Sequence, residues 1–155
     1  MDSSPEVALR RAELEREAPI AARSTWMRTR LKGAEVVFLC GTIGVEFDAW
    51  QRRLSVTSAA DAFLSQQIGL DAVEKVMDDL EEEVRVKIEE GGSGVPAASR
   101  VRLMPRRSPG YGDLPLELSR EIINRLDATK KIGVSITDSN LLVPSKSVTA
   151  ICEIC

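Results

Sequence analysis

The sequence predicts an α+β fold: a small, mainly antiparallel sheet flanked by helices. A stretch at about residues 59–90 repeats apolar side chains every three or four positions, which indicates one long amphipathic helix. The last quarter of the chain is rich in β-branched residues and broken by turn residues, which indicates short strands. We expect residues 1–155 to form a single domain.

The first half of the chain predicts two helices around two strands. Residues 4–22 read as a helix, because Ser4 can cap it and Pro5 suits a first turn. "STWMRTRLK" alternates in the manner of a half-exposed strand, and "AEVVFLCGTIG" reads as a buried strand that ends in a turn. A short helix over about residues 45–54 follows.

The long helix has a start signal and one anomaly. Ser58 and Asp61 have the spacing of a capping box. The predicted apolar stripe consists of Leu70, Val73, Met77, Leu80 and Val84. Gly69 lies inside the helix, where glycine costs about 1 kcal/mol relative to alanine, so we expect a kink or close packing there.

The second half predicts a loop, a strand, a helix and further strands. "EEGGSGVPAAS" reads as a flexible loop, and "SRVRLM" alternates like a strand. "LPLELSREIINRLDA" reads as an amphipathic helix. "KIGVSIT", "NLLV" and "SVTAICEI" read as C-terminal strands.

Composition excludes several classes of function. A net charge of −3 and the lack of a basic tail argue against a nucleic-acid partner. The chain has no histidine, so it cannot supply a Ser-His-Asp triad or a histidine metal ligand. No stretch approaches the length of an apolar membrane span, and we expect a cytoplasmic protein, since three cysteines without framework spacing fit a reducing compartment.

The stretch "RRSPGYGDLP", residues 106–115, contains the only tyrosine and the clearest turn signal. Ser108-Pro109-Gly110-Tyr111 has the order of a type II turn, and the following Gly112 suits close approach of a ligand to the backbone and its N–H groups. Arg106 and Arg107 add guanidinium groups suited to a carboxylate. The chemistry is compatible with an anion or carboxylate pocket with one aromatic wall, or with a surface turn beside incidental arginines.

Residues 34–151 resemble the activation (reactivation) domain of vitamin B12-dependent methionine synthase, in a short free-standing form. The resemblance lies in "RRSPGYGDLPLELSREIINRLDATKKIGVSITDSNLLVPSKSVTA", together with "FLCGTIGVEFDAW" and "QQIGLDAVEKVMDDLEEEVR" upstream. Residues 1–33 match only weakly.

The resemblance implies a function within a larger system. Domains of that family bind S-adenosylmethionine, whose methyl group restores cobalamin after its cobalt has been oxidised. The cobalamin would be carried by the partner, a cobalamin-dependent methionine synthase or related corrinoid protein. The electron would come from a flavodoxin-like donor. This chain would therefore be part of a methyltransferase system and act in trans, rather than be a complete enzyme.

The same resemblance implies the ligand-binding residues. Arg106 would grip the ligand, Ser108 and Gly110 would contact it from the turn, and Tyr111 would be the tyrosine of the turn. Glu74, at the edge of the apolar stripe, would supply negative charge. Other readings are a ligand-free module that docks on a corrinoid methyltransferase or its electron donor, and an unrelated metabolite-binding domain.

Several other polar residues have less specific expectations. We expect Asp78 on a solvated helix face, Asp113 orienting the turn, and Lys146 at the surface. Cys40 reads as a core residue. Cys152 and Cys155 are either ordinary strand-end cysteines or the first half of a metal or redox site.

Overall fold

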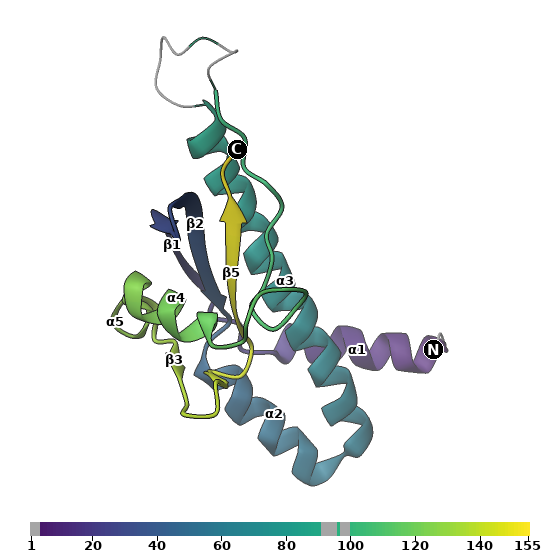
Figure 1. The fold of residues 1–155 in the computed structure, drawn as a ribbon. Helices are drawn as coiled ribbons and strands as arrows, with labels where there is room; N and C mark the ends of the chain where they lie inside the picture. The colour runs from purple at the N-terminus through teal and green to yellow at the C-terminus, as the bar shows by residue number, and fades with distance from the viewer. Residues whose placement is uncertain (1–3, 91–95, 97–99) are drawn as a thin grey trace.

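The computed structural model describes residues 4–90, 96 and 100–155, and the predicted α+β class is confirmed. Five helices in these residues surround a three-stranded antiparallel sheet and a two-stranded one (Figure 1). The predicted loop at 89–99 lies mostly outside the described residues.

The main sheet has the strand order β1-β2-β5. β1 (Arg23–Leu31) and β2 (Ala34–Thr42) form a hairpin through Lys32 and Gly33, both at positive φ, as a tight two-residue hairpin requires. β5 (Ser147–Glu153) pairs antiparallel with the other edge of β2. The central strand β2 therefore pairs with β1 from the N-terminal part of the chain and with β5 from its C-terminal part.

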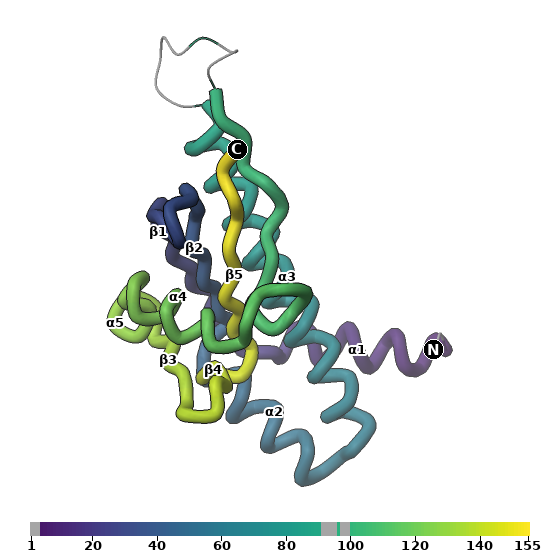
Figure 2. Tube along the Cα trace, in the orientation of Figure 1, coloured from purple at the N-terminus to yellow at the C-terminus, as the bar shows by residue number. Residues whose placement is uncertain are grey.

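Helices cover both faces of this sheet, so β2 is buried on both sides (Figure 2). Val36, Phe38 and Cys40 pack toward α4 (Leu118–Leu126) and α5 (Ala128–Ile132). Val37 and Leu39 pack toward α3 (Ala59–Glu90). This explains why β2 reads as a continuous apolar run rather than an alternating one.

The predicted long helix is confirmed as α3, with two differences in detail. Ser58 Oγ accepts a hydrogen bond from the Asp61 backbone N–H at 3.1 Å, but the Asp61 carboxylate binds Arg10 of α1. Leu70 was wrongly assigned to the buried stripe, since it is 51% exposed, whereas Val73, Met77, Leu80 and Val84 are buried.

Close packing explains Gly69. A Cβ at this position would lie 2.7 Å from the Phe47 ring and 2.9 Å from Lys146 Cε. Phe47 belongs to α2 (Val45–Thr57), which runs three residues further than predicted. The missing side chain lets α2, α3 and the start of β5 meet.

α1 (Pro5–Glu17) is shorter than predicted. Ser4 caps it, and Ala18 at its C-terminus is extended, because the following Pro19 disfavours helical backbone in the residue before it. Leu14 is fully buried against the end of the core formed with α2 and α3.

The prediction that "SRVRLM" forms a strand was wrong. Residues 102–107 run along β5 with isolated bridges at Leu103 and Arg107. Val101 and Leu103 do turn inward while Arg100 and Arg102 are exposed. Pro105 lacks a backbone N–H, so it cannot continue the ladder.

The C-terminal elements are shorter than predicted. The helix expected over 114–128 begins at Leu118, and Asp127 at φ 56° separates α4 from α5. α5 takes up the start of "KIGVSIT", so β3 comprises only Ser135–Ile136. It pairs with β4 (Leu142–Val143).

Candidate functional site

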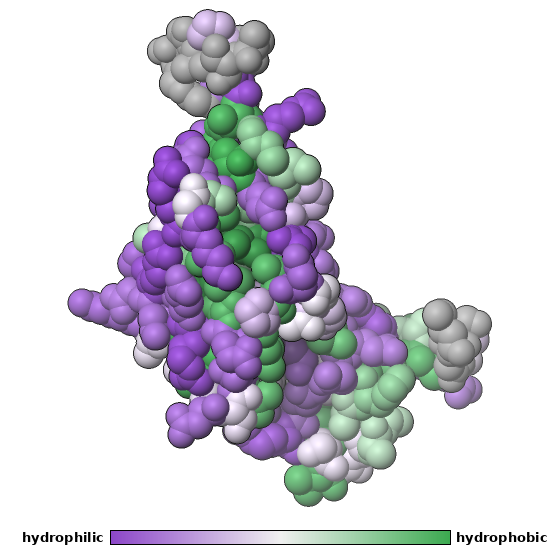
Figure 3. All heavy atoms as spheres, viewed as in Figure 1, coloured by the Kyte–Doolittle hydropathy of each residue, from purple (hydrophilic) through white to green (hydrophobic). Residues whose placement is uncertain are grey.

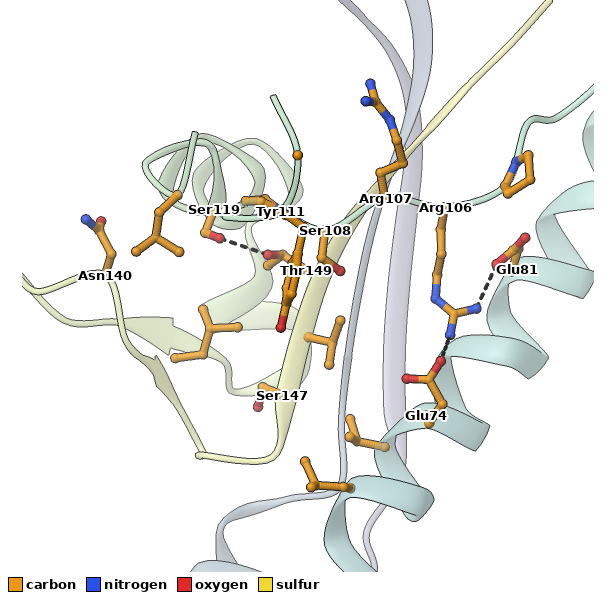
Figure 4. Close-up of a pocket in the computed structure, with 18 of the residues that line it drawn as sticks. Glu74, Glu81, Arg106, Arg107, Ser108, Tyr111, Ser119, Asn140, Ser147 and Thr149 are labelled. Carbon is orange, nitrogen blue, oxygen red and sulfur yellow. Dashed lines mark hydrogen bonds and ion pairs between the residues drawn. The ribbon is translucent and has the colours of Figure 1, made fainter. Parts of the chain in front are cut away.

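An open hollow of about 1030 Å³ lies where α3, the 105–116 segment and the start of β5 meet (Figures 3 and 4). We call it the central hollow. Its lining residues are Leu70, Asp71, Val73, Glu74 and Glu81 of α3; Pro105, Arg106, Arg107, Ser108, Pro109, Tyr111, Gly112 and Leu116; and Ser119, Asn140, Leu142, Ser147, Val148 and Thr149. Its volume is close to the upper end of the range found for small-molecule sites.

Four of the five predicted site residues line this hollow: Glu74, Arg106, Ser108 and Tyr111. Gly110 is not part of the lining but holds the turn, with φ at 93° as a type II turn requires. The Tyr111 N–H donates to Ser108 O at 3.3 Å, and the Gly110 N–H donates to Leu114 O at 2.9 Å. These two N–H groups are thus used within the turn, contrary to the expectation that they face a ligand.

Arg106 is the charged centre of one side of the hollow. Its side chain is 15% exposed, and its guanidinium lies 2.7 Å from Glu81 and 2.9 Å from Asp78, with Glu74 as a third partner (Figure 4 shows Glu74 and Glu81). Burial opposes the charge, but the hydrogen bonds to Glu81 and Asp78 and the charge of Glu74 raise the pKa of Arg106 on balance. We call these four residues the Arg106 cluster.

The cluster contains one residue of the predicted site besides Arg106, and two further acids. Glu74, expected at the edge of the apolar stripe, has a side chain that is 62% exposed, and Asp78 lies on a solvated helix face as expected but is also paired with Arg106. Glu81, which is 15% exposed, was missed. The sequence did contain a signal for Glu81, because positions 74, 78 and 81 have the spacing of residues on one face of a helix.

Arg107 has a different environment from Arg106. It is 44% exposed and pairs with Asp113 at 2.8 Å and Glu153 at 2.7 Å. In Figure 4 the two arginine side chains point in different directions from the same segment. Asp113 therefore holds the turn through its ion pair with Arg107. Asp113 does not cap α4, because Glu117 is the residue that directly precedes this helix.

The other side of the hollow carries neutral polar groups. The hydroxyls of Ser119 on α4 and Thr149 on β5 lie 3.0 Å apart. Ser147 Oγ contacts Thr42 Oγ1 at 2.8 Å. Asn140 accepts a hydrogen bond from Arg120 at 3.2 Å. Ser119, Asn140, Ser147 and Thr149 lie within the stretch that carries the family resemblance, but no local motif singles them out, so the sequence did not assign them to the site.

Lys146 was wrongly placed at the surface, since only 7% of it is exposed. It packs in the notch that Gly69 leaves between α3 and Phe47. Burial lowers the pKa of Lys146, and the nearby Asp48 partly opposes that effect. The neighbouring Ser145 donates from its backbone N–H and its hydroxyl to Asp48, which anchors the start of β5 on α2.

The three cysteines are free and differ in their exposure. Cys40 is a core residue as predicted, and burial raises the pKa of Cys40 and Cys152 to about 12, so both thiols stay protonated near neutral pH. Cys155 is exposed and free. The described part of the chain contains no group of three or more cysteine, aspartate or glutamate residues placed to hold a metal ion. Within that part, no helix combines the length and apolar character needed to cross a membrane.

Comparison with known proteins identifies a structural neighbour. No protein-family model matches the sequence, and no curated protein matches it. Among solved structures, the chain is similar to the MetH reactivation domain, crystallised bound to AdoHcy, with a TM-score of 0.63 and 19% identity. The match covers 77% of this chain and 39% of that one. Over the matched part, the chain therefore shares the fold of the MetH reactivation domain.

Proposed function

We propose that this chain binds S-adenosylmethionine in the central hollow and supports reductive methylation of cobalamin carried by a methionine synthase or related corrinoid protein. The observation that carries the proposal is the arrangement of Glu74, Arg106, Ser108 and Tyr111 around one hollow. The neighbour's bound AdoHcy, the demethylated form of S-adenosylmethionine, supports the choice of ligand.

The chemistry of the hollow suits this ligand. S-adenosylmethionine has an ammonium, a sulfonium and a carboxylate beside an aromatic base. The acidic side chains of the Arg106 cluster suit the cationic groups, and the guanidinium suits the carboxylate. Tyr111, which is 76% exposed, offers a ring at the rim. When bound, the ligand supplies an electrophilic methyl group to the reduced cobalt of the partner.

The residues of this chain would have holding and positioning roles. Arg106 is held by Glu81 and Asp78 before any ligand arrives, so a ligand carboxylate would share or replace one of these contacts. The hollow is open to one side, which would leave a bound sulfonium within reach of a partner protein. A flavodoxin-like donor would supply the electron to the partner and needs no site in this hollow.

Isothermal titration with S-adenosylmethionine tests binding. We expect saturable binding that Arg106→Ala and Tyr111→Ala each weaken at least about 10-fold, the usual effect of losing a charged or stacking contact. Val56→Ala is the matched control for Tyr111→Ala, because Val56 is 85% exposed and lies outside the hollow. Absence of binding at millimolar ligand would contradict the proposal.

One observation favours a second candidate, the ligand-free docking module. Arg106 already has three carboxylate partners in this structure, so its charge is compensated without a ligand. Under this candidate, a cobalamin methyltransferase is retained by the chain equally with and without S-adenosylmethionine. Retention that depends on the ligand would favour the first proposal.

A further inference from the structure

Two buried hydroxyls lie on the neutral side of the central hollow. Ser119 and Thr149 are 4% and 3% exposed, and both line the hollow. They are 30 residues apart in sequence, on α4 and β5, and their oxygens are 3.0 Å apart. Figure 4 shows this hydroxyl pair beside Tyr111, on the side of the hollow opposite Arg106.

The hydroxyl pair has hydrogen-bonding capacity left over. Two hydroxyl groups carry two protons and four lone pairs, and the bond between them uses one of each. In the described residues this bond is the one side-chain hydrogen bond of each oxygen, and it leaves neither oxygen without a partner. Since both residues also line the hollow, the remaining O–H and lone pairs are available to a group that enters it.

The surroundings indicate a flat, partly polar ligand group. Leu116 and Leu142 contribute apolar walls, and the Tyr111 ring lies at the rim. A group that both donates and accepts beside an aromatic face matches adenine, whose amino group donates while an adjacent ring nitrogen accepts. Stacking on tyrosine suits the same base. The Arg106 cluster on the opposite side is suited to the amino-acid end of the ligand instead.

We propose that the Ser119–Thr149 hydroxyl pair recognises the amino edge of adenine and determines specificity for adenosyl compounds. The inference rests on the proposed function, and it assigns the two sides of the hollow: the base on the hydroxyl pair and the amino-acid end on the Arg106 cluster. The alternative is a purely structural role, in which the hydrogen bond only holds α4 against β5. The test must distinguish this role from ligand recognition.

Titration with two ligands separates these roles. The probes are AdoHcy and a counterpart in which hydrogen replaces the 6-amino group of the base. The wild-type chain binds AdoHcy about 3- to 10-fold more tightly, the effect of one neutral hydrogen bond. Thr149→Val and Ser119→Ala reduce or abolish that preference, because they weaken AdoHcy binding more than binding of the counterpart, which lacks the amino group but keeps the ring nitrogen. Ser55→Ala, on α2 and outside the hollow, keeps it.

Each other outcome is decisive. If Thr149→Val weakens both ligands equally, or lowers only the melting temperature, the pair is a structural clamp and the inference is wrong. If the wild-type chain binds both ligands equally well, the proposed function stands and the inference fails. If it binds neither of these ligands nor S-adenosylmethionine, the proposed function fails and this inference with it.

Discussion

The Arg106 guanidinium lies 2.7 Å from the Glu81 carboxylate, and both side chains are only 15% exposed. This pair fixes the 105–116 segment against α3 and is the least exposed part of the Arg106 cluster. The outer partners, Glu74 and Asp78, are more than 60% exposed. Arg106 therefore makes one largely buried contact, with Glu81, that stabilises the fold, and its contacts with Glu74 and Asp78 are exposed.

Arg106→Ala should destabilise the fold as well as weaken binding. Without the guanidinium, three carboxylates face one another and Glu81 loses a charge-assisted hydrogen bond, so we expect the free energy of unfolding to fall by about 2 kcal/mol. Urea denaturation measures it. Arg107→Ala is the control, because its ion pairs are exposed and should change stability by less than about 1 kcal/mol. Equal losses would contradict the difference in burial.

Glu74→Gln should reduce selectivity for a positively charged ligand. S-adenosylmethionine has a net positive charge, whereas AdoHcy is neutral overall, so removal of one exposed carboxylate weakens S-adenosylmethionine by about 2- to 5-fold and AdoHcy less. Titrations at low and high salt measure the effect, which added salt should diminish. The exposed Glu82, also on α3 but outside the hollow, provides the control variant Glu82→Gln. An equal loss for both ligands would count against the assigned role of Glu74.

Asp61→Asn should remove an acid-dependent contribution to stability. Hydrogen bonds from Arg10 hold the pKa of Asp61 below its ordinary value of 3.8. A carboxyl with a lowered pKa in the folded chain stabilises it above the unfolded-state pKa, and that contribution disappears as the pH falls through the folded value. The stability difference between wild type and Asp61→Asn should therefore shrink below about pH 4. Urea denaturation over a pH series measures this, and Val56→Ala should show a constant difference.

Gly69→Ala should destabilise the chain although alanine favours helix. The gain in helix propensity is about 1 kcal/mol. The added Cβ would lie 2.7 Å from the ring of Phe47, which is fully buried, and overpacking costs about 1–3 kcal/mol. We expect a net loss of about 1 kcal/mol by thermal or urea denaturation.

The double variant Gly69→Ala/Phe47→Leu checks that cause. The smaller side chain leaves room for the new Cβ, so Gly69→Ala should cost less in the Phe47→Leu background than in the wild type. The same cost in both backgrounds would show that the Phe47 ring is not the obstacle.

The sequence by itself determined the α+β class, the long helix and the two N-terminal strands. These depend on local periodicity: the stripe from Val73 to Val84 and the apolar run in β2 are visible without any tertiary contact. It also predicted the turn at Ser108–Tyr111, because the order of proline and glycine sets the backbone there.

The tertiary structure decided what these elements place together. Residues 102–107 form an irregular segment along β5, because Pro105 cannot donate a backbone hydrogen bond. Lys146 is buried beside α3, because Gly69 has no side chain to occupy that space. The Ser119–Thr149 pair belongs to the site only because α4 and β5 meet beside the hollow. Glu81 shares a helix face with Glu74, but its contact with Arg106 depends on how the 105–116 segment packs on α3. Periodicity shows which side of an element is apolar, but which polar side chains from distant segments come into contact depends on how the elements pack.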